Sequence, residues 1–410
     1  MIMNTQIKWI ITIVAVGIAA AGAIVWLVYF NTPALNTATN TGSQFAQSEN
    51  RTSTTVTETG GTNTVEPVIF TEVSDKKIFK IANGPIAGAT LIQITRPATS
   101  TIARFVIQTN GHAFDLILDS PGAVPKAVSN TTIPGIIKVT WSEKGRGALM
   151  QYFDASILKT VHFLLPPPAS TSTVPVRVQF LPEGIASIAV SPDGANVVYL
   201  VKTAGGSDGY TANADGGSVK KLFSLPLSQI SIAWPSADTL LAQSAPSASV
   251  PGVVFSIDAK TGANAPLIYA NGLTAVADRS FSRVIYQTAD TSRSTYVRDT
   301  KTGLSKTLSF DPIPEQCIFG NATSTTMYCA TPLAYVPVNY LDLRHTGKAN
   351  TPLSILSFNV ASGRSSVIAT PGTDGGEQAD IAEMSISADD KYLIYIRKGD
   401  RSLWAVRLTQ

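Results

Sequence analysis

Side chains that bind metals or act as catalysts are scarce in this chain, which has only 2 cysteines and 3 histidines among 410 residues. No Cys-x-x-Cys motif occurs, and His112, His162 and His345 stand far apart, outside any metal-ligand spacing. The sequence therefore predicts no catalytic residue, no cofactor-binding residue and no metal ligand. Enzymatic activity stays open, but a non-catalytic role is favoured.

Charge is also scarce. Charged residues make up 14% of the sequence, the net charge is +3, and no run of lysine or arginine stands out. No nucleic-acid partner is expected, because binding to phosphates relies on a concentrated basic surface. Hydrophobic residues, at 44%, instead indicate a well-packed domain.

A long uncharged apolar run occupies residues 9–30. As an α-helix it would span roughly 33 Å, enough to cross the hydrocarbon core of a bilayer. Lys8 precedes the run and the next charge downstream is Glu49. The positive-inside rule then predicts a short cytoplasmic tail at 1–8 and an extracytoplasmic location for everything after residue 30. The run is thus predicted to be the signal anchor of a single-pass cell-membrane protein.

A cleaved signal peptide is the alternative, since residues 19–21 are three alanines that could form a cleavage motif. Cleavage there would leave an apolar tail at 22–30, which favours the uncleaved anchor. Residues 31–66 are rich in Asn, Thr, Ser and Gly. They are predicted to form a flexible linker, because they contain too little apolar surface to offset the entropy of ordering.

Short strands separated by turns are expected from residue 67 to residue 410. The clearest hairpin signal is Ser191-Pro192-Asp193-Gly194, which lies between apolar runs rich in valine and isoleucine. Weaker copies recur at Ser142, Pro235, Asp278, Gly320 and Ser387. The steps between successive copies are 49, 44, 43, 42 and 67 residues.

A second kind of turn follows most of these copies, and in it an Asn or Asp stands four residues before a glycine. It occurs at 213–217, 258–262, 299–303 and 359–363. Two turns in each repeat of ~40–45 residues imply four strands, which matches the blade of a β-propeller. The predicted fold is an all-β propeller of about seven four-stranded blades, with six or eight possible. A β-sandwich is the alternative, but the regular period disfavours it.

Both kinds of turn resemble those of the TolB-like and WD-repeat-like propellers of bacterial envelopes. The resemblance rests on residues 191–194 followed by Tyr199, and on a degenerate copy at 387–390 followed by Tyr395. It covers roughly residues 70–410 and implies an architecture, not an activity.

The last repeat contains only three strand signals, at 384–386, 392–396 and 403–408. Propellers commonly complete such a blade with a strand from the N-terminal end of the domain, and residues 77–81 are the candidate. This pairing would remove the free sheet edges. The closing strand is expected to enter from the face opposite the blade-to-blade connections, with the linker on that side.

Cys317 and Cys329 flank one hairpin. With the turn at Thr323, Ile318 lies opposite Tyr328 and Cys317 opposite Cys329, which brings the two thiols within bonding distance. A structural disulfide is predicted, and an extracytoplasmic location would let it persist. Two free buried thiols and a redox pair are the alternatives.

The same repeat is oversized because of an insertion at 331–352. In propellers, loops between second and third strands share a face with the blade-to-blade connections, and that face often binds ligands. The insertion is a candidate binding loop, or else a surface loop with local packing only. Its candidate binding residues are Tyr335, Tyr340, Asp342, Arg344 and His345.

The sequence best fits a protein-binding or scaffold module of the cell envelope, whose partner is an envelope protein or a cell-surface polymer. The alternatives are a hydrolase or glycan-binding protein that uses the propeller mouth, and an accessory component of a secretion or pilus assembly. Two or more carboxylates that converge at the central channel would favour the hydrolase. An apolar or aromatic rim would favour binding.

Overall fold

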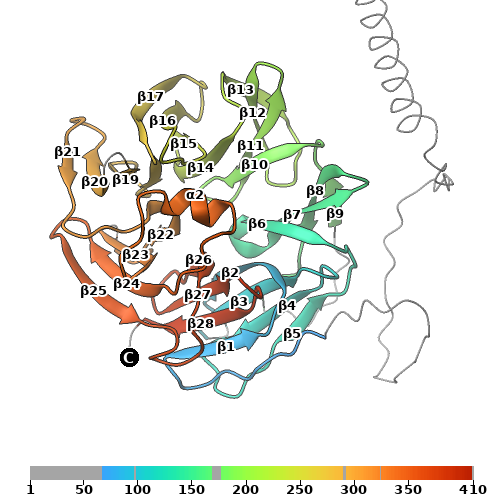
Figure 1. Ribbon diagram of the computed structural model, residues 1–410. Coiled ribbons are helices and arrows are strands. Elements are labelled where there is room, and N and C mark those ends of the chain that lie inside the picture. The colour runs from blue at the N-terminus through green and yellow to red at the C-terminus, as the bar shows by residue number, and fades with distance from the viewer. Residues whose placement is uncertain (1–66, 97, 169–176, 290–291, 324, 409–410) are drawn as a thin grey trace, which may run out of the picture. The chain divides into compact units, whose positions relative to one another are not determined.

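The computed structural model describes residues 67–410 apart from 97, 169–176, 290–291, 324 and 409–410. The predicted tail at 1–8, transmembrane helix at 9–30 and linker at 31–66 lie outside the described residues. Within the described part of the chain, no helix is long and apolar enough to cross a membrane. These residues form seven four-stranded antiparallel sheets (Figure 1), which confirms the all-β propeller with seven blades.

Blades 1 to 6 each use four consecutive strands, and blade 7 combines the two ends of the domain. Blade 1 comprises β2 (Ile86–Ile94), β3 (Ser100–Ile107), β4 (Ala113–Ile117) and β5 (Lys126–Ser129). Blade 2 comprises β6 (Ile136–Ser142), β7 (Gly147–Asp154), β8 (Ile157–Leu164) and β9 (Arg177–Phe180). Blade 3 comprises β10 (Ile185–Val190), β11 (Asn196–Thr203), β12 (Gly206–Asn213) and β13 (Lys220–Leu225). Blade 4 comprises β14 (Ile230–Ser236), β15 (Thr239–Ser244), β16 (Pro251–Asp258) and β17 (Asn264–Asn271). Blade 5 comprises β18 (Thr274–Ala277), β19 (Arg283–Ala289), β20 (Arg293–Asp299) and β21 (Ser305–Thr307). Blade 6 comprises β22 (Cys317–Phe319), β23 (Thr326–Thr331), β24 (Ser354–Asn359) and β25 (Arg364–Ala369). Blade 7 comprises β26 (Ile381–Ile386), β27 (Tyr392–Arg397), β28 (Leu403–Arg407) and β1 (Ile78–Ala82).

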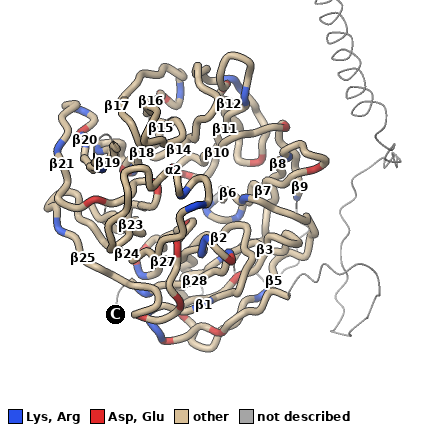
Figure 2. The backbone as a smooth tube through the Cα atoms, in the orientation of Figure 1, with Lys and Arg blue, Asp and Glu red and all other residues tan. Residues whose placement is uncertain are grey.

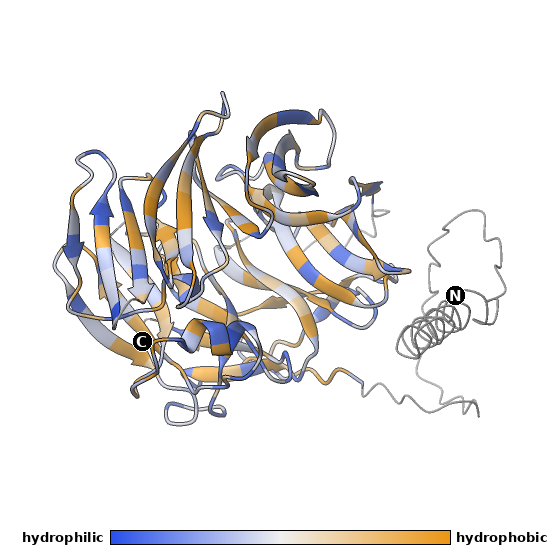
Figure 3. Cartoon of the chain, turned by 45° about the horizontal axis from the view of Figure 1, so that its top comes forward, coloured by the Kyte–Doolittle hydropathy of each residue, from blue (hydrophilic) through white to orange (hydrophobic). Residues whose placement is uncertain are grey.

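Apolar side chains fill the spaces between neighbouring blades. One cluster joins Ala189 and Val198 of blade 3 to Ile232 and Leu240 of blade 4, all of them buried. Hydrophobic and hydrophilic positions alternate along the strands (Figure 3), because successive side chains point to opposite faces of a sheet. Charged residues of both signs are scattered over the backbone (Figure 2).

The hairpin at 191–194 forms the predicted turn between β10 and β11. Ser191 Oγ accepts a hydrogen bond from Asn196 N at 2.9 Å, and the Asp193 carboxylate accepts one from Ala195 N at 3.0 Å. Gly194 has φ +81°, the left-handed conformation that this turn requires. In the blade 7 copy, Ser387 Oγ accepts a hydrogen bond from Tyr392 N at 3.0 Å, and Asp390 takes the left-handed position in place of glycine.

The second predicted turn joins the third and fourth strands of a blade. In blade 5, Asp299 Oδ1 accepts hydrogen bonds from Thr302 N at 2.7 Å and Thr302 Oγ1 at 2.9 Å. These bonds lower the pKa of Asp299 below its usual value. The equivalent carboxylate of Asp258 in blade 4 is held in the same way by Thr261. Local side-chain chemistry therefore fixes these turns.

The ring closes in blade 7. Strand β1 pairs with β28 in antiparallel register, with Ile78 opposite Val406 and Ala82 opposite Leu403. The closing strand was predicted at 77–81 and lies one residue further along. Because the two ends of the domain share one sheet, the ring has no free edge at this seam.

The two faces of the ring carry different loops. We call the side with the connections between blades, such as residues 226–229, the connection face. The side with the hairpin at 191–194 and its copies is the turn face.

Strand β1 starts at the turn face, as expected, because Ile78 lies opposite Val406 near the end of β28. The first described residues, however, lie beside the other end of β1, at the connection face. Ile69 O accepts a hydrogen bond from Asn83 N at 3.1 Å, at the end of β1 that leads into blade 1, and Phe70 bridges to Ala82. The chain then crosses to the turn face, where Val73 O accepts a hydrogen bond from the β4–β5 turn. It crosses here because Phe70 and Val73 pack into the apolar cluster between blades 7 and 1.

Candidate functional site

The insertion between β23 and β24 lies on the connection face and forms the short helix α2 (Tyr340–His345). Figure 1 shows α2 near the centre of the ring. The helix ends where Gly347 adopts φ +74° and Lys348 N donates to Leu343 O at 2.8 Å. Because the helix is so short, its stability comes from contacts with the blades.

Tyr340 anchors the start of α2. Its side chain is 1% exposed and packs against Ile313, Val336 and Leu341. The guanidinium of Arg293, from blade 5, lies 5.9 Å from the ring centroid of Tyr340. This distance is typical of a cation–π contact.

Arg344 forms a buried ion pair at the connection from blade 6 to blade 7. Its guanidinium bonds Asp380, and the two side chains are 7% and 1% exposed. Lys398 of blade 7 donates from Nζ to Arg344 O at 3.1 Å and to Ala349 O at 3.0 Å. Few buried charges occur without such partners, because an isolated buried charge is costly.

Two further side chains connect α2 to blades 4 and 6. Asp342 Oδ2 accepts a hydrogen bond from Ala248 N of blade 4 at 2.9 Å. His345 Nε2 lies 2.8 Å from Glu315 Oε2, which precedes β22. The hydrogen bond that His345 donates to Glu315 raises the pKa of His345 above its ordinary value, against the opposing effect of burial.

Four of the five candidate binding residues therefore hold the insertion in place, and one faces solvent. Tyr335 is 93% exposed, and Leu333 beside it is 63% exposed. A rigid loop with an exposed aromatic side chain resembles the energetically important part of many protein interfaces. Within the predicted set, Tyr335 is the most exposed, and His345 is also exposed although it is bound to Glu315.

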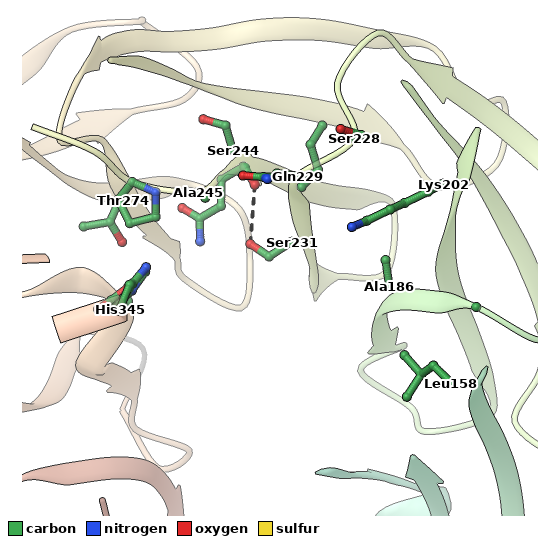
Figure 4. Close-up of a pocket in the computed structure, with 15 residues that line it drawn as sticks. Leu158, Ala186, Lys202, Ser228, Gln229, Ser231, Ser244, Ala245, Thr274 and His345 are labelled. Atoms are coloured by element: carbon green, nitrogen blue, oxygen red, sulfur yellow. Dashed lines mark hydrogen bonds and ion pairs between the residues drawn. The ribbon is translucent and has the colours of Figure 1, made fainter. Parts of the chain in front are cut away.

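A cavity of about 670 Å³ opens beside α2 at the connection face. Figure 4 shows His345 approaching it from α2, with Lys202, Gln229 and Thr274 on the blades around it. Gln243 Oε1 accepts a hydrogen bond from Ala275 N at 2.8 Å, which fixes the orientation of the amide. The hydroxyl of Thr274 is buried and has no hydrogen-bond partner in the described part of the chain.

The cavity can form hydrogen bonds but lacks paired acids. Glu315 is the single carboxylate among its lining residues, and His345 already binds it. Glycoside hydrolysis commonly uses two carboxyl groups, and the cavity offers no second one. Its lining contains no Phe, Trp or Tyr and mixes apolar side chains, such as Leu158 and Ile230, with polar ones. It therefore lacks the paired carboxylates of a hydrolase mouth and has a partly apolar lining without an aromatic rim.

Other residues of reactive types have structural roles. A Gly-x-Ser-x-Gly pattern occurs at 205–209, but Ser207 lies within β12, is 2% exposed and donates from Oγ to Leu227 O at 2.8 Å. It is not on the sharp strand-to-helix turn that such a nucleophile needs. Across the described residues, no group of three or more His, Cys, Asp or Glu side chains could hold a metal ion.

Cys317 and Cys329 form the predicted disulfide, with Cα atoms 4.1 Å apart. The register is also as predicted, with Ile318 opposite Tyr328. The bond ties β22 to β23 two residues before the insertion begins. It therefore braces the stem of the insertion.

No protein-family model matches the sequence, and no curated protein sequence does either. Among solved structures, an oligogalacturonate lyase in complex with manganese is 12% identical over 84% of this chain and 97% of that chain, with a TM-score of 0.58. An oligogalacturonate lyase from Vibrio parahaemolyticus is 12% identical over 84% and 98%, with a TM-score of 0.52. TolB from Acinetobacter baumannii is 13% identical over 68% and 61%, with a TM-score of 0.40. At such low identity the likeness to the two lyases shows the propeller fold alone.

Proposed function

We propose that the chain is a membrane-anchored, extracytoplasmic β-propeller that binds a protein partner of the cell envelope through the insertion on its connection face. The observation that carries this proposal is the contrast within the insertion. Buried contacts to four blades fix its helix, while Tyr335 and Leu333 stay exposed. Exposed aromatic side chains on a rigid support lose little entropy on binding, so they are effective anchors for a partner.

The location rests on the sequence. Residues 9–30 are long and apolar enough for a membrane anchor, and the charge bias places the propeller outside the cytoplasm. The Cys317–Cys329 disulfide supports this location, because such bonds persist in oxidising compartments.

Crosslinking on intact cells, followed by mass spectrometry, tests the binding face. A double variant, Leu333→Ser with Tyr335→Ala, should lose most crosslinks to its partner. Because both side chains are exposed, the thermal midpoint should not change. Tyr269→Ala is the matched control, since Tyr269 is 72% exposed on the outer strand of blade 4. Equal partner recovery by the double variant and the control would count against this face.

The anchor is tested separately by fractionation. The full chain should stay with membranes after an alkaline carbonate wash and should retain residue 1 at its N-terminus. A mature N-terminus near residue 22 would instead identify a cleaved signal peptide. The binding face can be correct in either case, so the two parts of the proposal fail independently.

A further inference from the structure

The central channel has a different character at the turn face. Two adjoining cavities of about 470 and 300 Å³ share Pro192, Arg279 and Ile318 in their walls. The larger is lined by residues of the inner strands of five blades, among them the apolar side chains of Ile92 and Ile386, and by Arg279 from a turn of blade 5. The two cavities adjoin at the hairpin turns, and their walls combine apolar side chains with polar ones such as Gln93 and Asn321.

The charged residues in the walls of these two cavities are both cations. Lys144 comes from the turn between β6 and β7, and Arg279 from the turn between β18 and β19. Neither forms an ion pair within the described residues, and no carboxylate lines either cavity. The sequence as a whole has nearly as many acids as bases, 28 Asp and Glu against 31 Lys and Arg, so this local excess is a property of the fold.

The carboxylates nearby accept hydrogen bonds from the hairpin turns of this face. Asp390 accepts hydrogen bonds from Asn321 N at 2.7 Å and Ala322 N at 3.1 Å. Asp193 is bound by Ser191 Oγ and Ala195 N, and these bonds, with a smaller contribution from Lys144, hold its pKa below the usual value. Asp193 attracts Lys144 and Asp390 attracts Arg279, so these acids offset part of the charge of the two cations.

Three buried hydrogen-bond donors in the channel walls have no partner among the described residues. They are Ser142 Oγ, Trp141 Nε1 and Trp234 Nε1. Trp141 lines the larger cavity and Trp234 the smaller one, whereas the hydroxyl of Ser142 lies against Gly147 beside His162. A buried donor without an acceptor is costly, so the two indole N–H groups favour an acceptor placed in the channel. An indole nitrogen can only donate.

We propose that the turn-face end of the channel binds an organic oxyanion, a carboxylate or phosphate carried on an apolar body. The anionic group would lie near Lys144 and Arg279 and accept a hydrogen bond from Trp141. The apolar body would extend between the inner strands, along Ile92, Ile318 and Ile386. Oxyanions bound by charged donors in a partly enclosed space form stronger hydrogen bonds than neutral ligands do.

Calorimetric titration of the purified full chain tests this site with 1-naphthoate, 1-naphthyl phosphate and the neutral isostere 1-naphthamide. At least one of the two anions should bind about tenfold more tightly than the amide, the difference expected for one charge-assisted contact. The tighter anion identifies the headgroup class. Arg279→Gln and Lys144→Gln should each weaken anion binding about tenfold. Trp141→Phe, which keeps the ring but removes the N–H donor, should weaken it about threefold.

Lys301→Gln is the matched control, because Lys301 lies in the turn between β20 and β21 of the same blade as Arg279 but does not line the channel. Its anion affinity should equal that of the wild type. Equal binding of amide and anions, or wild-type affinity in both Arg279→Gln and Lys144→Gln, overturns the proposal. If either variant loses its near-ultraviolet circular dichroism signal, it has not folded, and the salt dependence of ligand binding by the wild type tests the proposal instead. Sodium chloride must then weaken binding of the anions and leave binding of the amide unchanged.

Discussion

The two mouths of the channel differ in how their charged side chains are held. On the connection face, Arg344 is paired with Asp380, His345 with Glu315, and Asp342 with a backbone amide of blade 4. The turn face also has ion pairs, such as Lys260–Asp238 and Lys391–Asp389, but Lys144 and Arg279 line its cavity without one in the described residues. Charges of the insertion therefore hold it to the blades, while two cations of the turn face remain available.

The difference follows from where the chain has extra length. The insertion adds a helix too short to be stable alone, so its ionisable side chains must pair with the blades beneath it. The turns of the opposite face need no such support, because each is completed by its own serine, aspartate or threonine. Substitutions on the connection face should therefore change stability far more than substitutions on the turn face.

The largest effect is expected from Arg344→Ala. It leaves Asp380 buried without its main partner, although Lys398 Nζ lies 3.7 Å away. Loss of one member of a buried pair should lower the free energy of unfolding by about 3 kcal/mol, measured by urea denaturation. Lys260→Ala, which breaks an exposed pair with Asp238, should leave the midpoint unchanged. A similar midpoint for both variants would contradict a structural role for Arg344.

The disulfide at the stem of the insertion should contribute nearly as much. The paired substitution Cys317→Ala with Cys329→Ala opens a loop whose ends are 12 residues apart. In the chain-entropy description this should cost about 3 kcal/mol. Thermal unfolding with and without a reducing agent checks it, since the reductant should lower the midpoint of the wild type and not of the variant. If the reductant does not change the thermal midpoint of the wild type, the bond does not stabilise this face.

The His345–Glu315 pair should give a smaller effect that depends on pH. The folded pKa of His345 is raised, so the pair stabilises the fold fully below the ordinary histidine pKa of about 6.5 and loses this effect as pH rises through the higher folded value. The pair is partly exposed, which limits it to about 1 kcal/mol or less. Unfolding of wild type and His345→Gln between pH 5.5 and pH 8.5 should show a gap that closes with rising pH, and a constant gap would contradict the assignment.

The smallest effect is expected on the turn face. Lys144→Gln should change the free energy of unfolding by no more than about 0.5 kcal/mol, because Lys144 is exposed and has no ion pair in the described residues. Lys144→Gly should stabilise the fold slightly, since Lys144 adopts φ +55°, a conformation that glycine reaches at no steric cost. A large loss of stability in Lys144→Gln would remove the distinction between the two faces.

Most of the architecture could be predicted because its causes are local. The serine and aspartate turns recur at a fixed spacing, and each is completed within a few residues, so a repeat in the sequence is a repeat in the structure. The oversized sixth blade, the closing strand near residue 78 and the pairing of Cys317 with Cys329 all follow from that spacing. The path of residues 69–73 could not be predicted, because it depends on an apolar groove between the first and last blades.

The sequence by itself indicated about seven blades, their closure and the disulfide, since turn chemistry and strand alternation act over a few residues. The structure fixed the number of blades at seven. Only the tertiary structure decided what the ionisable side chains do. Arg344 and Asp380 are 36 residues apart and meet because neighbouring blades bring their connections together. Lys144 and Arg279 come from blades 2 and 5 and line one cavity because the ring turns the ends of its inner strands toward a common axis. Pairings of this kind depend on ring geometry, which no local pattern encodes.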